Sequence, residues 1–246
     1  MDSVFITTAI GAFLAAGCVK GVIGLGLPLT SIAILTTTIG LRDAIPLIVI
    51  PVLITNIWQA SQGGALAQHF RRFWSLNLLL CAGTWGGTVM LFRIDPWILT
   101  LVLGVVIICY ALINMFAVTM TVRKGSEVWL SPSVGAFSGL LTGLTGSVGA
   151  PVAIYLQALG LGKEEFLQAI SLSFFLAAVA WIPSLASQSA FDLDIALKSS
   201  MALIPAFAGM WVGQRIRGYL SELYFRRGVF LFLIIVGANL IRRAVL

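Results

Sequence analysis

Apolar residues recur along the whole chain in long runs, and short polar stretches separate these runs. The run from Ile98 to Val118 and the run from Gly228 to Ile241 contain no charged residue. Such runs approach or reach the roughly 20 residues that cross the hydrocarbon core of a bilayer at about 1.5 Å per residue. The pattern therefore predicts an all-α protein built of transmembrane helices.

The runs fall into two sets of five segments. The first set is expected at about residues 4–20, 26–39, 44–61, 74–92 and 97–118, and the second at about 132–145, 149–160, 167–187, 195–214 and 226–243. In each set, the first two segments are short and flank a cluster of glycines. Each short pair is either two spans or one interrupted, re-entrant helical hairpin, and the other three segments are expected to span the membrane.

The two sets also match in sequence. With one residue inserted, Gly17, Gly21, Gly24, Gly26 and Pro28 align with Gly139, Gly143, Gly146, Gly149 and Pro151. At a similar offset, the segment Gly83-Thr84-Trp85-Gly86-Gly87 aligns with Gly209-Met210-Trp211-Val212-Gly213. Two matches at nearly the same offset indicate an internal duplication. We predict an N-terminal transmembrane repeat, 1–122, and a C-terminal one, 128–246, joined by the polar stretch 123–127.

Basic residues indicate how the two repeats are oriented. An odd number of crossings in each repeat would invert the repeats relative to each other. It would place Lys20, Arg71, Arg72, Arg123, Lys124, Lys163, Arg215, Arg217, Arg226 and Arg227 on one face, against Arg42, Arg93, Lys198, Arg242 and Arg243 on the other. One long broken span in place of each pair would give parallel repeats and remove this bias. Because cytoplasmic loops carry the excess of Lys and Arg, we predict inverted repeats with both termini outside the cytoplasm.

Composition narrows the class of protein. Of 246 residues, 59% are hydrophobic and 10% are charged, and the mean hydropathy is +1.04. The chain therefore has more apolar residues than the core of one soluble domain can bury. The net charge of +6 comes from scattered residues, so we expect the lipid bilayer as a partner and no nucleic acid. The three cysteines and His69 show no metal-ligand spacing. No metal or cofactor is expected, and His69 is expected to be a solvated interfacial residue.

The two glycine clusters are the candidate substrate-binding site. A broken helix inside a membrane must be buried in protein or line a watery cavity, because free backbone groups are costly there. The N-terminus of the helix after the break offers unpaired N–H groups and about half a positive charge, which suits an anion. Proline is tolerated in the first turn of such a helix. The predicted binding positions are Gly21, Gly24, Gly26, Pro28, Gly143, Gly146, Gly149 and Pro151. Helix packing is the alternative, since Gly17, Gly21 and Gly143 fit small-xxx-small spacing.

Polar side chains near the clusters complete the candidate site. Lys20 lies far from either end of its apolar segment, where a charge is costly unless it is paired or hydrated. It is expected either to bind the anion or to extend its amine to a nearby interface. Asn56 and Gln59 share a helix face that lines the pathway or nears the interface. Hydroxyl donors stand at the matching place in the second cluster: Thr142, Thr145 and Ser147. No carboxylate occupies a clear mid-span position, and no catalytic residue is predicted.

In these glycine segments and tandem hydrophobic halves the chain resembles the TauE/SafE family of sulfite exporters and related anion permeases. The resemblance covers essentially the whole chain and implies a bacterial inner-membrane permease for sulfite, sulfoacetate or a related anion. We expect export by alternating access. The first cluster departs from the family pattern in having fewer glycines and a lysine at position 20. An anion channel is one alternative. A membrane-embedded enzyme or thiol-relay protein that uses Cys18 is another, and the sequence does not indicate an oligomeric state.

Overall fold

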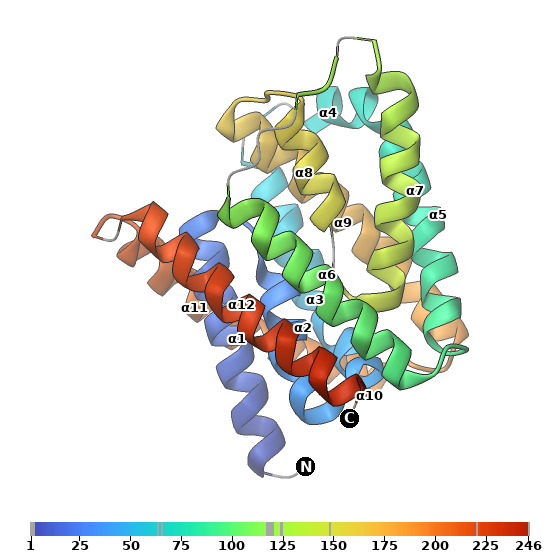
Figure 1. Cartoon of the computed structure of the whole chain (residues 1–246), viewed down its shortest axis with the longest axis vertical. Helices are drawn as coiled ribbons and strands as arrows, with labels where there is room; N and C mark the ends of the chain where they lie inside the picture. Colours follow the sequence, from blue (N-terminus) through green and yellow to red (C-terminus); the bar gives the residue numbers. More distant parts are fainter. Residues whose placement is uncertain are drawn as a thin grey trace.

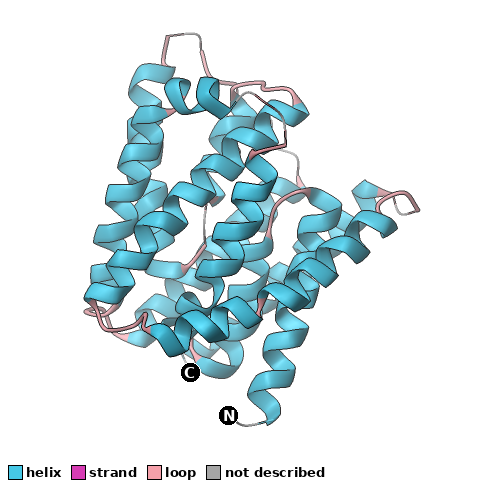
Figure 2. Ribbon diagram, turned by 180° about the vertical axis from the view of Figure 1, so that it is seen from behind, coloured by secondary structure: helices cyan, strands magenta, loops and turns pink. Residues whose placement is uncertain are grey.

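The protein is helical throughout the part described by the computed structural model, which comprises residues 3–62, 64, 66–116, 121–123, 125–147, 149–219 and 221–245 (Figures 1 and 2). Within these ranges no β-strand forms. In chain order the helices are α1 (Ser3–Ile23), α2 (Leu27–Ile39), α3 (Leu41–Ala60), α4 (Leu66–Arg72), α5 (Trp74–Leu91), α6 (Pro96–Met115), α7 (Glu127–Thr145), α8 (Ala150–Ala158), α9 (Lys163–Ser187), α10 (Leu193–Met201), α11 (Leu203–Ile216) and α12 (Glu222–Val245). Lys124 of the predicted linker, Val148 of the second cluster and the end of the segment predicted at 97–118 lie outside the described residues.

The ten predicted segments are confirmed as helices, and two short helices are added to them. The segment predicted at 195–214 is divided at Ala202 into α10 and α11, and α10 starts where the Asp192 carboxylate accepts a hydrogen bond from the Ile195 N–H at 2.8 Å. The other addition, α4, occupies a stretch expected to be a loop. The expectation for His69 was wrong, because α4 places this side chain inside the protein, 4% exposed and stacked on Phe73.

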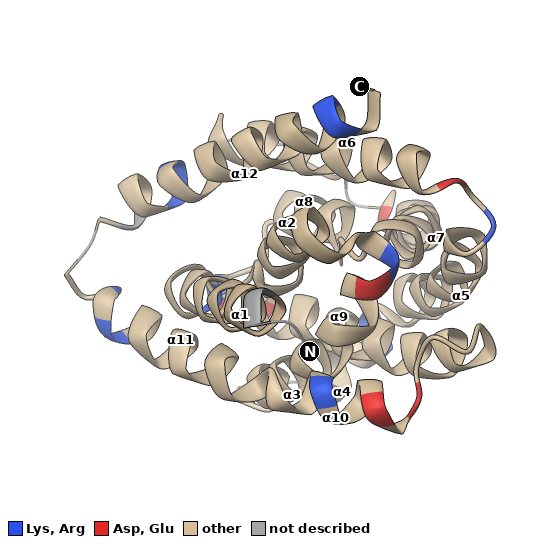
Figure 3. Ribbon diagram, turned by 90° about the horizontal axis from the view of Figure 1, so that it is seen from below, with Lys and Arg blue, Asp and Glu red and all other residues tan. Residues whose placement is uncertain are grey.

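Six helical segments are long and apolar enough to cross a membrane: Phe5–Ile23, Leu41–Ala60, Pro96–Met115, Lys163–Ser187, Leu193–Ile216 and Leu223–Val245. Helices α5 and α7 are not among them. Both carry Gly, Ser and Thr where they contact each other, and these residues lower the hydropathy of the helix. The charged residues lie mainly towards the helix ends, whereas most of the helical ribbon carries none (Figure 3).

Each glycine cluster forms the turn of a helical hairpin. Helix α1 begins at the lower end of Figure 1, near both chain termini, and α2 turns back towards that end, where Arg243 donates a hydrogen bond to the Thr37 carbonyl at 2.7 Å. Helix α7 begins at the upper end, and α8 turns back to that end, where the Val122 N–H donates to the Ala158 carbonyl at 2.9 Å. The first helices of the two hairpins therefore run in opposite directions.

The two hairpins are held by close contacts to helices of the other half. Helix α1 packs on α11, and α7 packs on α5. In the first contact, a Cβ at Gly17 or Gly21 would collide with the carbonyl oxygen of Ala206 or Met210. In the second contact the same is true of glycines on both helices: Gly83, Gly87, Gly135, Gly139 and Gly143. Small residues allow such close approach of backbones, which favours helix association in membranes.

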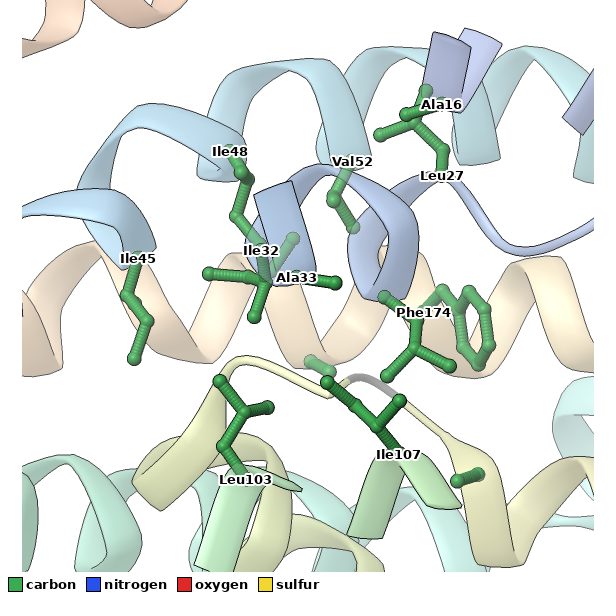
Figure 4. Packing of buried hydrophobic residues seen from close by; sticks show 14 of the residues in the cluster. Ala16, Leu27, Ile32, Ala33, Ile45, Ile48, Val52, Leu103, Ile107 and Phe174 are labelled. Atoms are coloured by element: carbon green, nitrogen blue, oxygen red, sulfur yellow. The ribbon is translucent and has the colours of Figure 1, made fainter. Parts of the chain in front are cut away.

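Helices α3 and α9 pack against each other between the hairpins, and α6 packs against α12. The apolar core fills the space around the second break, where Ile32 and Ile45 face Leu103 and Ile107 (Figure 4). These four side chains are fully buried. The core therefore surrounds the two breaks and fixes their positions relative to each other.

Candidate functional site

The breaks are short turns with glycine at the left-handed position before each new helix. Gly26 precedes α2 with φ +105°, and Gly149 precedes α8 with φ +79°. A side chain at either position is strained by its φ, which costs about 1–2 kcal/mol. It is also crowded, because a Cβ at Gly26 would lie 3.0 Å from Val19 Cγ1 and a Cβ at Gly149 would overlap the ring of Phe174. Both turns thus require glycine for conformation and for space.

The two helix N-termini line a common cavity. Its wall includes Gly26 and Pro28 from the first break and Gly149 and Ala150 from the second. The first intrahelical N–H donors are Thr30 in α2 and Ala153 in α8, and neither helix has a side-chain cap. The N–H groups of the first turns are therefore free of intrahelical acceptors, and the positive ends of two helix dipoles point at one space.

This central cavity is closed in the conformation described. Its volume is about 10 Å³, which is about what one water molecule needs. Apolar side chains complete the wall: Leu25, Leu29, Ala153 and Phe174, with Tyr110 from α6. An anion larger than water enters only when these side chains move.

Lys20 is buried beside the first break and does not extend to the surface. The side chain is 3% exposed, and Nζ donates a hydrogen bond to Asn56 Oδ1 of α3 at 2.5 Å. The Asn56 amide in turn donates to the Val52 carbonyl at 2.7 Å. Among the described residues, Asn56 is the one acceptor bonded to Lys20, and no carboxylate pairs with it. The amine therefore retains donor capacity for a ligand or water, although it does not line the central cavity.

Gln59 binds the backbone that the first break leaves free. Its Nε2 donates to the Gly24 carbonyl at 2.9 Å, and its Oε1 is buried without a partner within the described ranges. A Cβ at Gly24 would lie 2.7 Å from Leu167 Cδ2. The structure thus brings Lys20, Asn56 and Gln59 together around the end of α1.

The second break carries hydroxyl groups instead of a charge. Thr145 donates to the Leu141 carbonyl at 2.7 Å, and its hydroxyl lies 2.5 Å from that of Ser147. Thr142, the counterpart of Lys20, is fully buried, and its hydroxyl finds no partner in the described part of the chain. A buried hydroxyl without a partner is unusual and is open to a water or a ligand.

The remaining predicted positions do not all face the cavity. Gly21 and Gly143 lie in the helix contacts with α11 and α5. Gly146 faces Ile32 and Ile45, and Pro151 lies in the first turn of α8 outside the cavity wall. The alternative interpretation of small-xxx-small packing therefore describes the contacts of Gly17, Gly21 and Gly143.

Sequence reasoning missed Tyr110, Leu25 and Phe174, which line the cavity with the glycines. Tyr110 gave little signal, because α6 also carries Thr100 and Asn114 and the spans contain many aromatic residues. Phe174 gave none, because only the fold shows that it covers Gly149. In the described residues no group of three or more His, Cys, Asp or Glu side chains lies together to hold a metal ion.

Comparison with known proteins identifies the family of the chain. No curated protein and no solved structure is significantly similar to the chain. The sequence model of the family described as "Sulfite exporter TauE/SafE" matches residues 9–240, nearly the whole length. Together with the apolar helices, this match identifies a multi-pass membrane transport protein. The chain belongs to the TauE/SafE sulfite exporter family.

Proposed function

We propose that the protein exports a small anion, sulfite or an organosulfonate such as sulfoacetate, across the cell inner membrane by alternating access. The observation that carries the proposal is the central cavity, where the uncapped N-termini of α2 and α8 meet. Backbone N–H groups and helix dipoles there favour negative charge. None of the described side chains that line this cavity is acidic.

The energetics favour export over import. With the cytoplasm negative, each negative charge that leaves gains about 2.3 kcal/mol per 100 mV. An exporter of anions therefore needs no coupling ion, in keeping with spans in which the sequence has no clear mid-span carboxylate. An importer of the same anion would need a proton or cation to offset this free energy.

The positions of the basic residues support the proposed orientation. Helix α4 and the starts of α7 and α9 lie at one end of the molecule, and the chain termini and α10 lie at the other (Figure 1). The first end carries Arg71, Arg72, Arg123 and Lys163, which belong to the larger group of basic residues. We place this end in the cytoplasm, with the repeats 1–122 and 128–246 inverted relative to each other.

The test is a flux assay with purified protein in liposomes, using sulfite, sulfate, thiosulfate, sulfoacetate and small carboxylates. We expect saturable flux of sulfite or a sulfonate and acceleration by the same anion on the opposite side. Flux that rises linearly with concentration and lacks counter-transport would indicate a channel instead. A variant without Cys18, Cys81 and Cys109 is expected to retain transport, whereas a thiol-relay protein would lose its function. Absence of flux for every anion in the panel would refute the proposal.

A further inference from the structure

A second cavity lies next to the central one and is much larger. Its volume is about 190 Å³, many times the roughly 10–15 Å³ that one water molecule needs. A small oxyanion with part of its hydration shell therefore fits in it. We call it the vestibule; its polar lining consists of Asn114, Gln157, Lys163 and Arg226.

The charge of the vestibule is positive. Lys163 and Arg226 line it, and no carboxylate does among the side chains that the structure describes. Neither cation forms an ion pair with an acidic side chain in the part of the chain that the structure describes. The Arg226 guanidinium lies over the Phe230 ring, 5.8 Å from its centroid, on the wall of the same cavity. A cleft lined by one sign of charge raises the local concentration of the opposite ion about 10- to 1,000-fold.

Two side chains separate the vestibule from the breaks. Leu25 and Tyr110 line both the vestibule and the central cavity. Tyr110 is 6% exposed, and its ring meets Phe230 edge-on with centroids 6.1 Å apart. The vestibule and the central cavity therefore share a wall that includes these two side chains.

The vestibule belongs to the end of the molecule that carries most of the basic residues. It is bordered by the last residue of α1, Ile23, by the C-terminal parts of α6 and α8, and by the first residue of α9, Lys163. At the opposite end the corresponding contact is filled: where Leu167 lies against Gly24, Ile45 lies against Gly146 and is fully buried. The space beside the first break is thus less tightly filled than the space beside the second. At the opposite end of the molecule a separate cavity of about 310 Å³ lies between α1 and α10, away from both breaks, and its wall is apolar except for Lys198.

We infer that the vestibule is the cytoplasmic loading site for the exported sulfur oxyanion or sulfonate, with Lys163 and Arg226 attracting it and Leu25 and Tyr110 closing the way to the breaks. The inference rests on the proposed export function and adds the residues that capture the substrate. Capture by these two cations predicts a low KM at low ionic strength, because exposed charges are screened by salt.

The first test compares the double variant Lys163→Gln/Arg226→Gln with Arg227→Gln in proteoliposome flux assays. Arg227 is exposed, follows Arg226 on α12 and does not line the vestibule. We expect the double variant to raise the KM for sulfite about tenfold with Vmax within twofold, and to weaken the dependence of KM on salt. Arg227→Gln is expected to stay within twofold of wild type. Equal KM values and equal salt dependence in the two variants would overturn the inference.

The second test does not depend on the charge substitutions. In a variant lacking the native cysteines, Asn114→Cys is treated with a membrane-impermeant thiol reagent in inside-out vesicles and in spheroplasts. We expect labelling in the inside-out vesicles and slower labelling in the presence of sulfoacetate. Labelling in spheroplasts alone, or no protection by an anion that the protein transports, would refute the loading site. Wild-type protein that transports no anion would instead refute the proposed function, and the sidedness of labelling would still be measured.

Discussion

The two breaks occupy matching places in the sequence but are stabilised differently. At the first break, α3 supplies polar side chains: Asn56 accepts a hydrogen bond from Lys20, and Gln59 donates to the Gly24 carbonyl. At the second break, apolar side chains cover the turn, with Phe174 against Gly149, and the hydroxyls bond locally. Side chains from another helix thus satisfy polar groups at the first break, whereas close apolar packing stabilises the second.

This difference suggests a division of roles. A buried amine with one partner retains attraction for an anion, whereas Gly146 and Gly149 of the second break are enclosed by aromatic and branched side chains. The first break is therefore expected to respond most to loss of charge, and the second to loss of space. Substitutions at the two breaks can test whether this division holds.

The largest effect is expected from Gly149→Ala. The left-handed φ costs about 1–2 kcal/mol for a residue with a Cβ, and overlap with Phe174 adds about 1–3 kcal/mol. We expect anion flux to fall more than tenfold and the unfolding temperature to drop. Gly26→Ala should be milder, since Val19 is the near neighbour at 3.0 Å.

Two controls separate strain from crowding at Gly149. Gly160 has a similar φ of +68°, but a Cβ added there would have no neighbour within 4 Å. The variant Gly160→Ala should therefore transport normally. Phe174→Ala added to Gly149→Ala should recover part of the stability because it removes the overlap. If Gly26→Ala proved as damaging as Gly149→Ala, the second break would not be the more tightly enclosed one.

A smaller effect is expected from Lys20→Met. Loss of a charged hydrogen-bond donor to the anion costs roughly 1–3 kcal/mol, so flux at low substrate should fall about tenfold. Lys20→Arg should retain more activity than Lys20→Met, although a planar guanidinium needs different space. Concentration-dependent flux in proteoliposomes measures both.

The double variant Lys20→Met/Asn56→Leu separates a structural role from binding. It removes both partners of the 2.5 Å hydrogen bond, so no unpaired amide oxygen is left behind by the lysine. We expect it to recover stability relative to Lys20→Met without recovering flux. Recovery of flux would show that Lys20 acts only by bonding to Asn56.

The smallest effects are expected from Gln59→Leu and Thr142→Val, and they should differ in kind. Gln59→Leu removes the hydrogen bond to the partly buried Gly24 carbonyl and should lower the free energy of unfolding by about 0.5–1.5 kcal/mol. Thr142→Val removes a hydroxyl with no partner among the described residues, so stability should be unchanged or slightly higher. Any loss of flux in Thr142→Val therefore reports a contact with the anion. Thermal unfolding in detergent together with flux distinguishes the two outcomes.

Much of the fold follows from local pattern, because the length of the apolar runs indicates the helices. The positions of glycine and proline indicate the breaks between them. The ten segments and the two breaks were predictable for this reason. The division at Ala202 was not, because it depends on the packing of α10 against α3. The prediction that His69 is solvated was wrong because a short helix buries this side chain between elements that are distant in sequence.

The site was predictable only in part. Glycine, proline and a buried lysine are conspicuous in an apolar sequence, and they located the breaks. The sequence could not show that Gly21 and Gly143 contact neighbouring helices while Gly26 and Gly149 line a cavity, since all four are glycines at similar spacing. Leu25, Tyr110 and Phe174 resemble the other apolar and aromatic residues of the spans, so only their positions in the fold distinguish them.

The glycine contacts of α1 with α11 and of α7 with α5 determine which parts of the molecule can move together. Each contact joins a helix before the linker to a helix after it, with backbones too close to admit a Cβ. Two halves interlocked in this way cannot rock past each other as separate rigid bodies. The units that shift during transport must be composite, each hairpin travelling with its partner from the opposite repeat. A cross-link between α1 and α11 should therefore leave transport intact, whereas one between α3 and α9 should arrest it.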